Sequence, residues 1–116
     1  MPNFPAVYAI RAALQYITSV EVGAIDRHAR PLVEACLEGL QKLPVDLITP
    51  NSEEALAGIL AFRHPQAERI HQYLREKQVH VMSQAGRLRV ALHGYNSMSD
   101  VERLLSGLTD ATETIR

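Results

Sequence analysis

Apolar side chains in the first third of the chain recur at the spacing of an α-helix. Val7, Ile10 and Leu14 follow one another at intervals of three or four residues, which is the period of one helix face. The pattern predicts that residues 4–41 are helical, with a break within residues 18–23, where Thr, Ser and Gly interrupt it. The second helical stretch has an apolar face made of Ile25, Ala29, Leu32, Val33, Cys36, Leu37 and Leu40.

Pro31 lies inside that second stretch. A proline in a helix interior removes a backbone hydrogen bond and clashes with the preceding turn. Pro31 is therefore expected either to kink this helix or to mark its true start.

The opening helix is apolar on nearly every side. Between Phe4 and Leu14 the only strongly polar side chain is Arg11, and helices of this kind are normally buried on more than one face. A two-layer domain of this length offers one core, so we expect another domain or chain to cover the other side. Tolerated exposure of alanine is the alternative, but Phe4 and Tyr8 are large and favour missing contacts.

The second half of the chain alternates between strand and helix patterns. A short strand is predicted over residues 45–48, a buried strand over 59–62, and a helix from Pro65 to about Lys77. Period-two alternation over residues 79–84 and 88–92 predicts a β-hairpin that turns at Ala85-Gly86. A last helix begins after Tyr95-Asn96, where residues 97–102 contain two overlapping capping patterns; its apolar stripe comprises Val101, Leu104, Leu105 and Leu108.

Together these elements predict an α+β domain with a small, mostly antiparallel sheet covered by helices on one face. The 116 residues form one domain, composed of a helical segment (4–41), a sheet-and-helix unit (45–108) and a polar tail (109–116) that is expected to fray. Length alone allows one core and little more.

Composition narrows the range of partners. Twelve basic residues balance thirteen acidic ones, for a net charge of −1, so no electrostatic footprint for nucleic acid or an anionic membrane is present. The single cysteine excludes an intramolecular disulfide and favours a reducing compartment, the cytoplasm. The start lacks the features of a signal peptide, and no apolar run approaches the roughly 20 residues of a membrane span.

Common catalytic constellations are missing from the sequence. The five histidines have no metal-ligand spacing supported by cysteine or clustered carboxylates, so no metal is expected. Cys36 lies on an apolar helix face and is expected to be a buried structural thiol. The chain contains no glycine-rich phosphate loop, and no Ser-His-Asp arrangement can be argued from spacing. We therefore assign no catalytic residue.

The second strand of the hairpin carries the most informative polar pattern. Its alternation places Arg87, Arg89, Ala91 and His93 on one face. A guanidinium group matches a carboxylate with two parallel charge-assisted hydrogen bonds, so Arg89 and His93 are candidate substrate-binding residues. A plain solvated sheet face is the alternative.

The run Arg89-Val90-Ala91-Leu92-His93-Gly94-Tyr95-Asn96-Ser97, followed by an acidic helix start, resembles the end of class V aminotransferases, a family of fold-type-I, pyridoxal-phosphate enzymes that includes cysteine desulfurases and isopenicillin-N-epimerase-like proteins. Residues 58–65 resemble the preceding strand and turn of that family. Residues 2–10 resemble a segment at its subunit interface. The resemblance covers nearly the whole chain and implies a C-terminal small domain of a homodimeric, pyridoxal-phosphate-dependent enzyme.

The resemblance also implies roles for particular residues. Arg89 occupies the position that binds the substrate α-carboxylate, and Tyr95 with Asn96 shapes the turn into the last helix. Asn3, Phe4 and Tyr8 fall in the interface segment. Ser97 replaces the usual Thr and Ala91 the usual Ser, which removes one polar contact of the pattern.

Two departures from the family concern its chemistry. Cysteine desulfurases carry a nucleophilic cysteine in a loop between the hairpin strands, whereas this chain has Ser83-Gln84-Ala85-Gly86 there, which favours transamination, epimerisation or lyase chemistry. The lysine that forms the internal aldimine has no counterpart, because Lys42 and Lys77 lie among polar residues and a Schiff-base lysine needs a desolvated site. We therefore expect a missing N-terminal domain that holds cofactor and lysine, and an isolated chain that is inactive.

Two interpretations from other classes remain. The order of elements in residues 59–108 resembles ferredoxin-like modules of the ACT type, which bind amino acids without chemistry, although no final strand follows Leu108. A structural dimerisation domain is the other interpretation.

Overall fold

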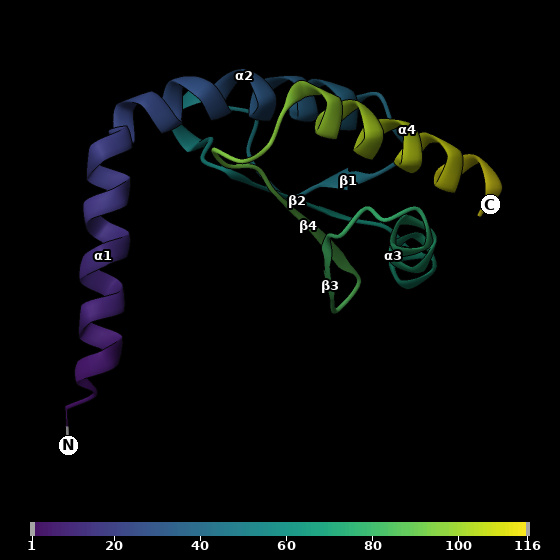
Figure 1. Cartoon of the computed structure of the whole chain (residues 1–116). Coiled ribbons are helices and arrows are strands. Elements are labelled where there is room, and N and C mark those ends of the chain that lie inside the picture. The colour runs from purple at the N-terminus through teal and green to yellow at the C-terminus, as the bar shows by residue number, and fades with distance from the viewer. Residues whose placement is uncertain (1, 116) are drawn as a thin grey trace.

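The computed structural model describes residues 2–115 and has an α+β fold (Figure 1). Within that range it contains four α-helices and four strands, with one short 3-10 turn at Glu53–Ala55. In chain order they are α1 (Phe4–Val20), α2 (Val22–Gln41), β1 (Asp46–Leu47), β2 (Ile59–Arg63), α3 (Ala67–Glu76), β3 (Met82–Gln84), β4 (Arg87–Ala91) and α4 (Met98–Thr114).

The strands form one antiparallel sheet in the order β1-β2-β4-β3. β2 and β4 are its central pair, with a register that runs from Ile59 opposite Ala91 to Arg63 opposite Arg87. Alternate side chains of both strands point into a core that α2, α3 and α4 cover, which confirms the predicted sheet with helices over one face. The largest fully buried side chains are Phe62, Leu40, Leu60, Ile70, Leu74, Leu88, Leu108, Val101 and Cys36.

The elements β2-α3-β3-β4-α4 form a split β-α-β arrangement, in which β4 lies between β2 and β3. The edge beside β2 is filled by β1, which precedes the unit in the chain, and not by a strand after α4. This explains why the sequence resembles a ferredoxin-like module and yet lacks its final strand.

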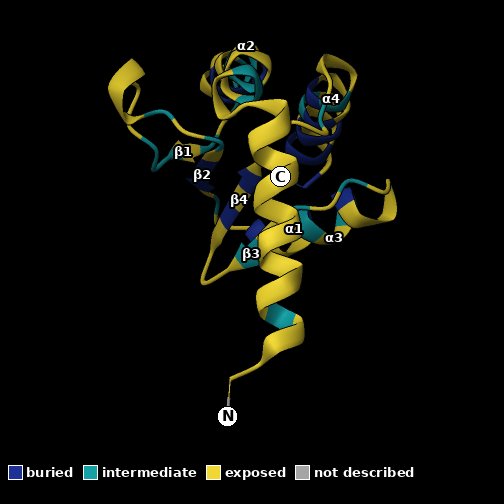
Figure 2. Ribbon diagram, turned by 60° about the vertical axis from the view of Figure 1, so that its left-hand side comes forward, coloured by how far each residue is buried: buried dark blue, intermediate teal, exposed yellow. Residues whose placement is uncertain are grey.

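Helix α1 projects from the rest of the molecule as an arm (Figure 1). All its residues are exposed except Ala6, which is half-buried (Figure 2). The Cα radius of gyration is 16.5 Å, compared with about 13 Å for a compact domain of this length. The predicted opening helix thus forms, but no described part of the chain covers its apolar surface.

The break between the two helices falls at Glu21, inside the predicted range. Glu21 has a φ of 75° and ends α1, while its own N–H donates to the Ile17 carbonyl. α2 then runs from Val22 through Pro31 to Gln41. The alternative that Pro31 marks the start of the second helix is therefore wrong.

The first hairpin strand is shorter than predicted, because residues 79–81 are bonded to α3. The Val79 N–H donates to the Leu74 carbonyl at 2.9 Å and closes the helix. Nε2 of His71 lies 3.1 Å from the Val81 carbonyl oxygen. β3 consequently begins at Met82, although residues 79–84 keep the predicted alternation of half-buried and exposed side chains.

The prediction that the chain frays beyond Thr109 is wrong. α4 continues to Thr114, and Ala111, Thr112 and Ile115 are buried. The Thr112 hydroxyl donates to the Leu108 carbonyl at 2.9 Å, which satisfies its polar group inside the helix. Residues 109–115 look polar in sequence, but Leu104, Leu108, Ala111 and Ile115 continue one helical stripe.

Candidate functional site

The face of the sheet that no described helix covers carries the predicted substrate-binding arginine. Arg89 lies in the middle of β4, opposite Ala61 of β2 on one side and Met82 of β3 on the other. Its side chain is exposed, as β4 alternates between buried and exposed positions from Arg87 to Ala91. Arg87, Arg89 and Ala91 therefore share this face as predicted, with Arg89 between the other two, but His93 does not belong to it, because the strand ends at Ala91.

A shallow depression on this face is lined by both β4 arginines. Its other lining residues are Ile48, Ala61, Met82 and Gln84. Within residues 2–115, no carboxylate lies within 4 Å of the Arg87 or Arg89 guanidinium group. The depression thus combines an apolar floor with guanidinium and amide donors that are available to an anionic ligand.

A third arginine, which was not predicted from the sequence, lies on the same face. Arg63 lies directly opposite Arg87 in the β2–β4 register, and its Nη1 is 3.9 Å from Oδ2 of Asp46 on β1. The alternation of β2, with Leu60 and Phe62 inside, could have placed Arg63 outside. Its proximity to Arg87 could not be predicted, because it depends on the register between strands that are 24 residues apart.

His93 lies beyond the end of β4, in the turn that leads to α4. Its Nδ1 accepts a hydrogen bond from the Tyr95 N–H at 3.3 Å. The two rings meet edge to face, with centroids 5.3 Å apart. Since Nδ1 is an acceptor, the neutral ring carries its proton on Nε2, and that atom is the donor left for a ligand.

Asn96 organises this turn. Its Oδ1 accepts from the His93 N–H at 3.0 Å, and its Nδ2 donates to Oδ2 of Asp100 at 3.4 Å. Tyr95 is exposed and contributes its backbone N–H and its ring. The Asn96 side chain thus connects the end of β4 to the first turn of α4.

A capping box starts α4. Oδ2 of Asp100 accepts the Ser97 N–H at 2.9 Å, and Oγ of Ser97 accepts the Asp100 N–H at 3.4 Å. The backbone hydrogen bond from Ser97, followed by the side-chain bond from Asn96, lowers the pKa of the Asp100 carboxyl below its ordinary value of 3.8. Of the two overlapping capping patterns, the one that begins at Ser97 is used.

The three expected interface residues lie at the free end of the α1 arm. Asn3 caps the helix, with its Oδ1 accepting the Ala6 N–H at 3.2 Å. The side chains of Phe4 and Tyr8 are 61% and 68% exposed. The α1 arm that carries them projects away from the sheet-and-helix unit (Figure 1).

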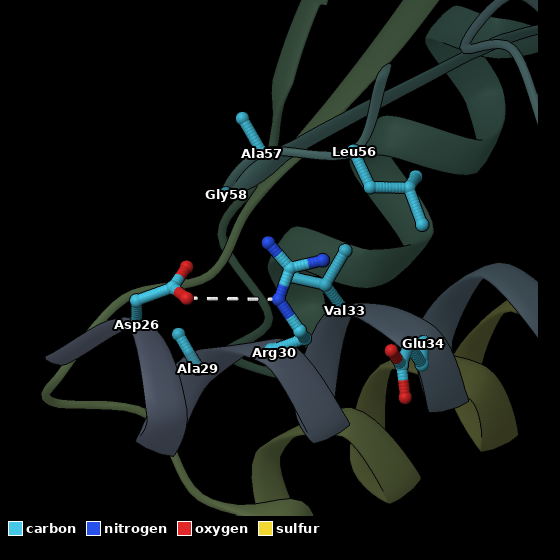
Figure 3. A pocket seen from close by; sticks show the side chains of 8 residues that line it. All are labelled: Asp26, Ala29, Arg30, Val33, Glu34, Leu56, Ala57 and Gly58. Carbon is cyan, nitrogen blue, oxygen red and sulfur yellow. Dashed lines mark ion pairs between the residues drawn. The ribbon is translucent and has the colours of Figure 1, made fainter. Parts of the chain in front are cut away.

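A second pocket lies between α2 and the segment that precedes β2 (Figure 3). Arg30 reaches from α2 toward the chain at Ala57 and Gly58, and Asp26 points toward it, with Oδ2 at 3.6 Å from Nε. Because this guanidinium group already has a carboxylate from its own helix, the pocket offers a weaker anion site than the sheet face.

The described residues do not fit a pyridoxal phosphate aldimine. The Lys42 side chain is 72% exposed and paired with Glu38 at 3.3 Å. Nζ of Lys77 lies 5.1 Å from the centre of the Tyr73 ring, and the residue is exposed. Neither amine has the desolvated surroundings that Schiff-base chemistry uses.

Among residues 2–115 no group of three or more metal-binding side chains is found, and no helix is long and apolar enough to cross a membrane.

The chain also lacks an accessible thiol. Cys36 is fully buried on α2, and burial raises the pKa of its thiol to about 12. The β3–β4 connection is the two-residue turn Ala85-Gly86, in which both φ angles are positive, as a type I′ turn requires. The hairpin therefore has no room for a loop that could present a nucleophile.

Comparison with known proteins shows the family. The model of the aminotransferase class-V family matches residues 1–104. A probable cysteine desulfurase from Pyrococcus abyssi is 25% identical over 99% of this chain and 32% of its own length. The apo structure of a cysteine desulfurase from Thermococcus onnurineus aligns with a TM-score of 0.89 and 25% identity, over 98% of this chain and 32% of that one.

A more distant structural relative was solved with a cofactor bound. This protein is a variant of C-DES with glycine covalently linked to its PLP cofactor. It aligns with a TM-score of 0.67 and 24% identity, over 85% of this chain and 27% of its own, and this likeness concerns the fold. The chain thus spans about a third of the length of the relatives that it matches.

Proposed function

Because the chain belongs to the aminotransferase class-V family, we propose that it forms the substrate-carboxylate-binding C-terminal domain of a pyridoxal-phosphate-dependent enzyme that acts on amino acids. The observation that carries the proposal is the position of Arg89. The family motif and the exposed centre of the sheet coincide at this residue, in a depression with no competing carboxylate within 4 Å among the described residues.

Arg89 performs a positioning task in this proposal. Its guanidinium group donates two parallel hydrogen bonds to the α-carboxylate and so fixes both the location and the rotation of the amino acid. Ala61 and Met82, its cross-strand neighbours, present apolar surface to the rest of the ligand. His93 lies beyond the end of β4 and outside the lining of the depression, so its Nε2–H is a donor only for a part of the ligand that extends past the strand.

The cofactor and its lysine belong to another part of the enzyme. Relatives are about three times as long as this chain, and neither lysine here is buried. We propose that α1 packs against the cofactor-binding domain and a homodimer partner, with Phe4 and Tyr8 among the contacts. This accounts for a helix that exposes Val7, Ile10 and Leu14 as well.

The reaction class is transamination, epimerisation or lyase chemistry on an amino acid. Desulfuration through this domain is disfavoured, although the relatives above include cysteine desulfurases, because persulfide formation uses an accessible thiolate. The only cysteine of the chain is fully buried. By itself the chain is expected to be inactive.

Ligand binding to the purified chain tests the role of Arg89. We expect L-alanine to shift the NMR signal of the Arg89 Nε–H group, with a dissociation constant in about the millimolar range. Arg89→Lys should weaken binding roughly twofold to tenfold, because an ammonium group cannot reproduce the two-bond fork. Arg75→Lys, at an exposed position of α3, is the matched control and should leave binding unchanged.

Equal affinity of the Arg89→Lys variant and the wild type for L-alanine removes Arg89 from the site.

A separate measurement addresses the cofactor. The chain mixed with pyridoxal phosphate and dialysed should retain no stoichiometric aldimine absorbance. A specific signal at one equivalent contradicts the assignment of the cofactor lysine to another domain.

A further inference from the structure

Two arginines line the depression on the sheet face, and the proposed function uses one of them, Arg89, to bind the α-carboxylate of an amino acid. We propose that Arg87 binds a second anionic group of the same ligand, so that this domain selects amino acids with an acidic side chain. The inference rests on the proposed function, since it takes Arg89 as the α-carboxylate site, and it adds the substrate class.

The spacing of the two arginines suits a ligand with two carboxylates. Arg87 and Arg89 are alternate residues of one strand and share its exposed face. Alternate residues of a strand are about 7 Å apart along its axis, and flexible arginine stems allow the guanidinium groups to approach each other. The two carboxylates of L-aspartate are separated by two carbon atoms, and those of L-glutamate by three.

The surroundings of Arg87 favour an incoming anion. Arg63 faces it across the β2–β4 pair, and like charges directly opposite each other repel. Asp46 is 3.9 Å from Arg63 and pairs with that residue, not with Arg87. Arg87 therefore has positive charge beside it and no carboxylate of its own among the described residues, an imbalance that a bound anion relieves.

The rest of the depression matches the remainder of such a ligand. Gln84 faces Arg87 in the β3–β4 register, and its side-chain amide can donate a hydrogen bond to the same anionic group. Ile48, Ala61 and Met82 supply the apolar surface against which the ligand methylenes can lie. Among the described residues that line the pocket beside α2, Arg30 is the one arginine, and Asp26 already pairs with it.

The test compares the binding of amino acids with one and with two carboxylates to the purified chain. L-glutamate, L-aspartate and L-alanine are titrated while the Nε–H signals of Arg87 and Arg89 are followed by NMR. We expect the acidic amino acids to bind roughly threefold to tenfold more tightly than L-alanine and to shift both signals, because a second charge-assisted contact forms at an exposed site. L-alanine should shift Arg89 alone.

Substitution isolates the second contact. Arg87→Gln should abolish the preference for L-glutamate, because it removes the second contact and weakens L-glutamate binding much more than L-alanine binding. Arg75→Gln removes the same charge from α3 and should preserve the preference. Because Arg87 is exposed, the variant is expected to fold, and Arg87→Lys provides a second variant in which part of the preference remains.

The outcomes separate this inference from the proposed function. If Arg89→Lys weakens L-alanine binding but L-glutamate shows no preference, the α-carboxylate site stands and the second site is wrong. The second site is also wrong if Arg87→Gln leaves L-glutamate binding intact, as it would if Arg87 served instead as a contact for an acidic protein surface. If Arg89→Lys changes nothing, the proposed function fails first.

Discussion

His28 and Asn96 are joined by a hydrogen bond of 2.7 Å between Nε2 of the histidine and the backbone carbonyl oxygen of the asparagine, across 68 residues of chain. Because a carbonyl oxygen can only accept, Nε2 carries the proton. The bond ties α2 to the turn that organises the start of α4. It therefore fixes the helical segment to the sheet-and-helix unit at the end of β4, next to the proposed binding face.

Replacing His28 tests this connection. His28→Ala should lower the free energy of unfolding by about 1 kcal/mol, the usual net contribution of one hydrogen bond. The loss is measured by urea denaturation followed by circular dichroism. His80→Ala is the matched control, since His80 is exposed and its side chain forms no hydrogen bond with any residue in the range 2–115. If His28→Ala is as stable as His80→Ala, the hydrogen bond of His28 has no structural role.

The capping box makes the stability of the folded protein depend on pH in the acidic range, through the carboxyl group of Asp100. The pKa of Asp100 is lower in the folded protein than its ordinary value of 3.8, because its carboxylate accepts hydrogen bonds from Ser97 and Asn96. The ionised group therefore stabilises the fold above that pH, and the stabilisation disappears as the pH falls through the folded-state pKa. We expect wild type to be more stable than Asp100→Asn at neutral pH.

The difference between the two proteins should shrink as the pH is lowered below about 4. Parallel denaturation curves at several pH values measure it. Asp110→Asn, at an exposed position of α4, serves as the control for removal of a carboxylate from the same helix. A stability difference that is constant with pH contradicts the assignment of the effect to ionisation.

Gly58 is required by a close approach of two backbones. The Leu92 N–H donates to the Gly58 carbonyl at 2.7 Å, and a Cβ at position 58 would lie 2.6 Å from the Leu92 carbonyl oxygen. Backbone cannot move aside as a side chain can, so Gly58→Ala should destabilise the protein by about 1–3 kcal/mol. In Gly94→Ala the new Cβ meets Ile25 at an ordinary 3.7 Å, and this variant should be tolerated. Equal stability of the two variants is the contradicting result.

The α1 arm should be the least protected helix of the isolated chain. Apart from Ala6 its residues are all exposed, and a 17-residue helix without tertiary contacts is marginally stable in water. Hydrogen exchange measured by mass spectrometry should therefore be faster in residues 4–20 than in α4, which packs against α2 and α3. Protection of α1 equal to that of α4 in a monomeric sample contradicts this description.

Local patterns in the sequence determined much of this protein. The period of the apolar positions predicted the two opening helices, the central strands and α3, since those patterns reflect which side of each element is buried. The turn at Ala85-Gly86 and a cap at Ser97 or Ser99 followed from residue types with specific backbone preferences, and the structure uses Ser97. Arg89 could be singled out because the family motif and the strand alternation point to the same residue.

Tertiary structure decided the features that depend on distant residues. Val79 and Val81 alternate like a strand, yet their backbone groups bond to α3, so β3 is short. The polar tail proved helical because Ala111 and Ile115 reach the core. Arg63 faces Arg87 only because β2 and β4 pair in one particular register. Local preferences specify an element and its inward side, whereas the packing of distant elements decides which exposed side chains share a site.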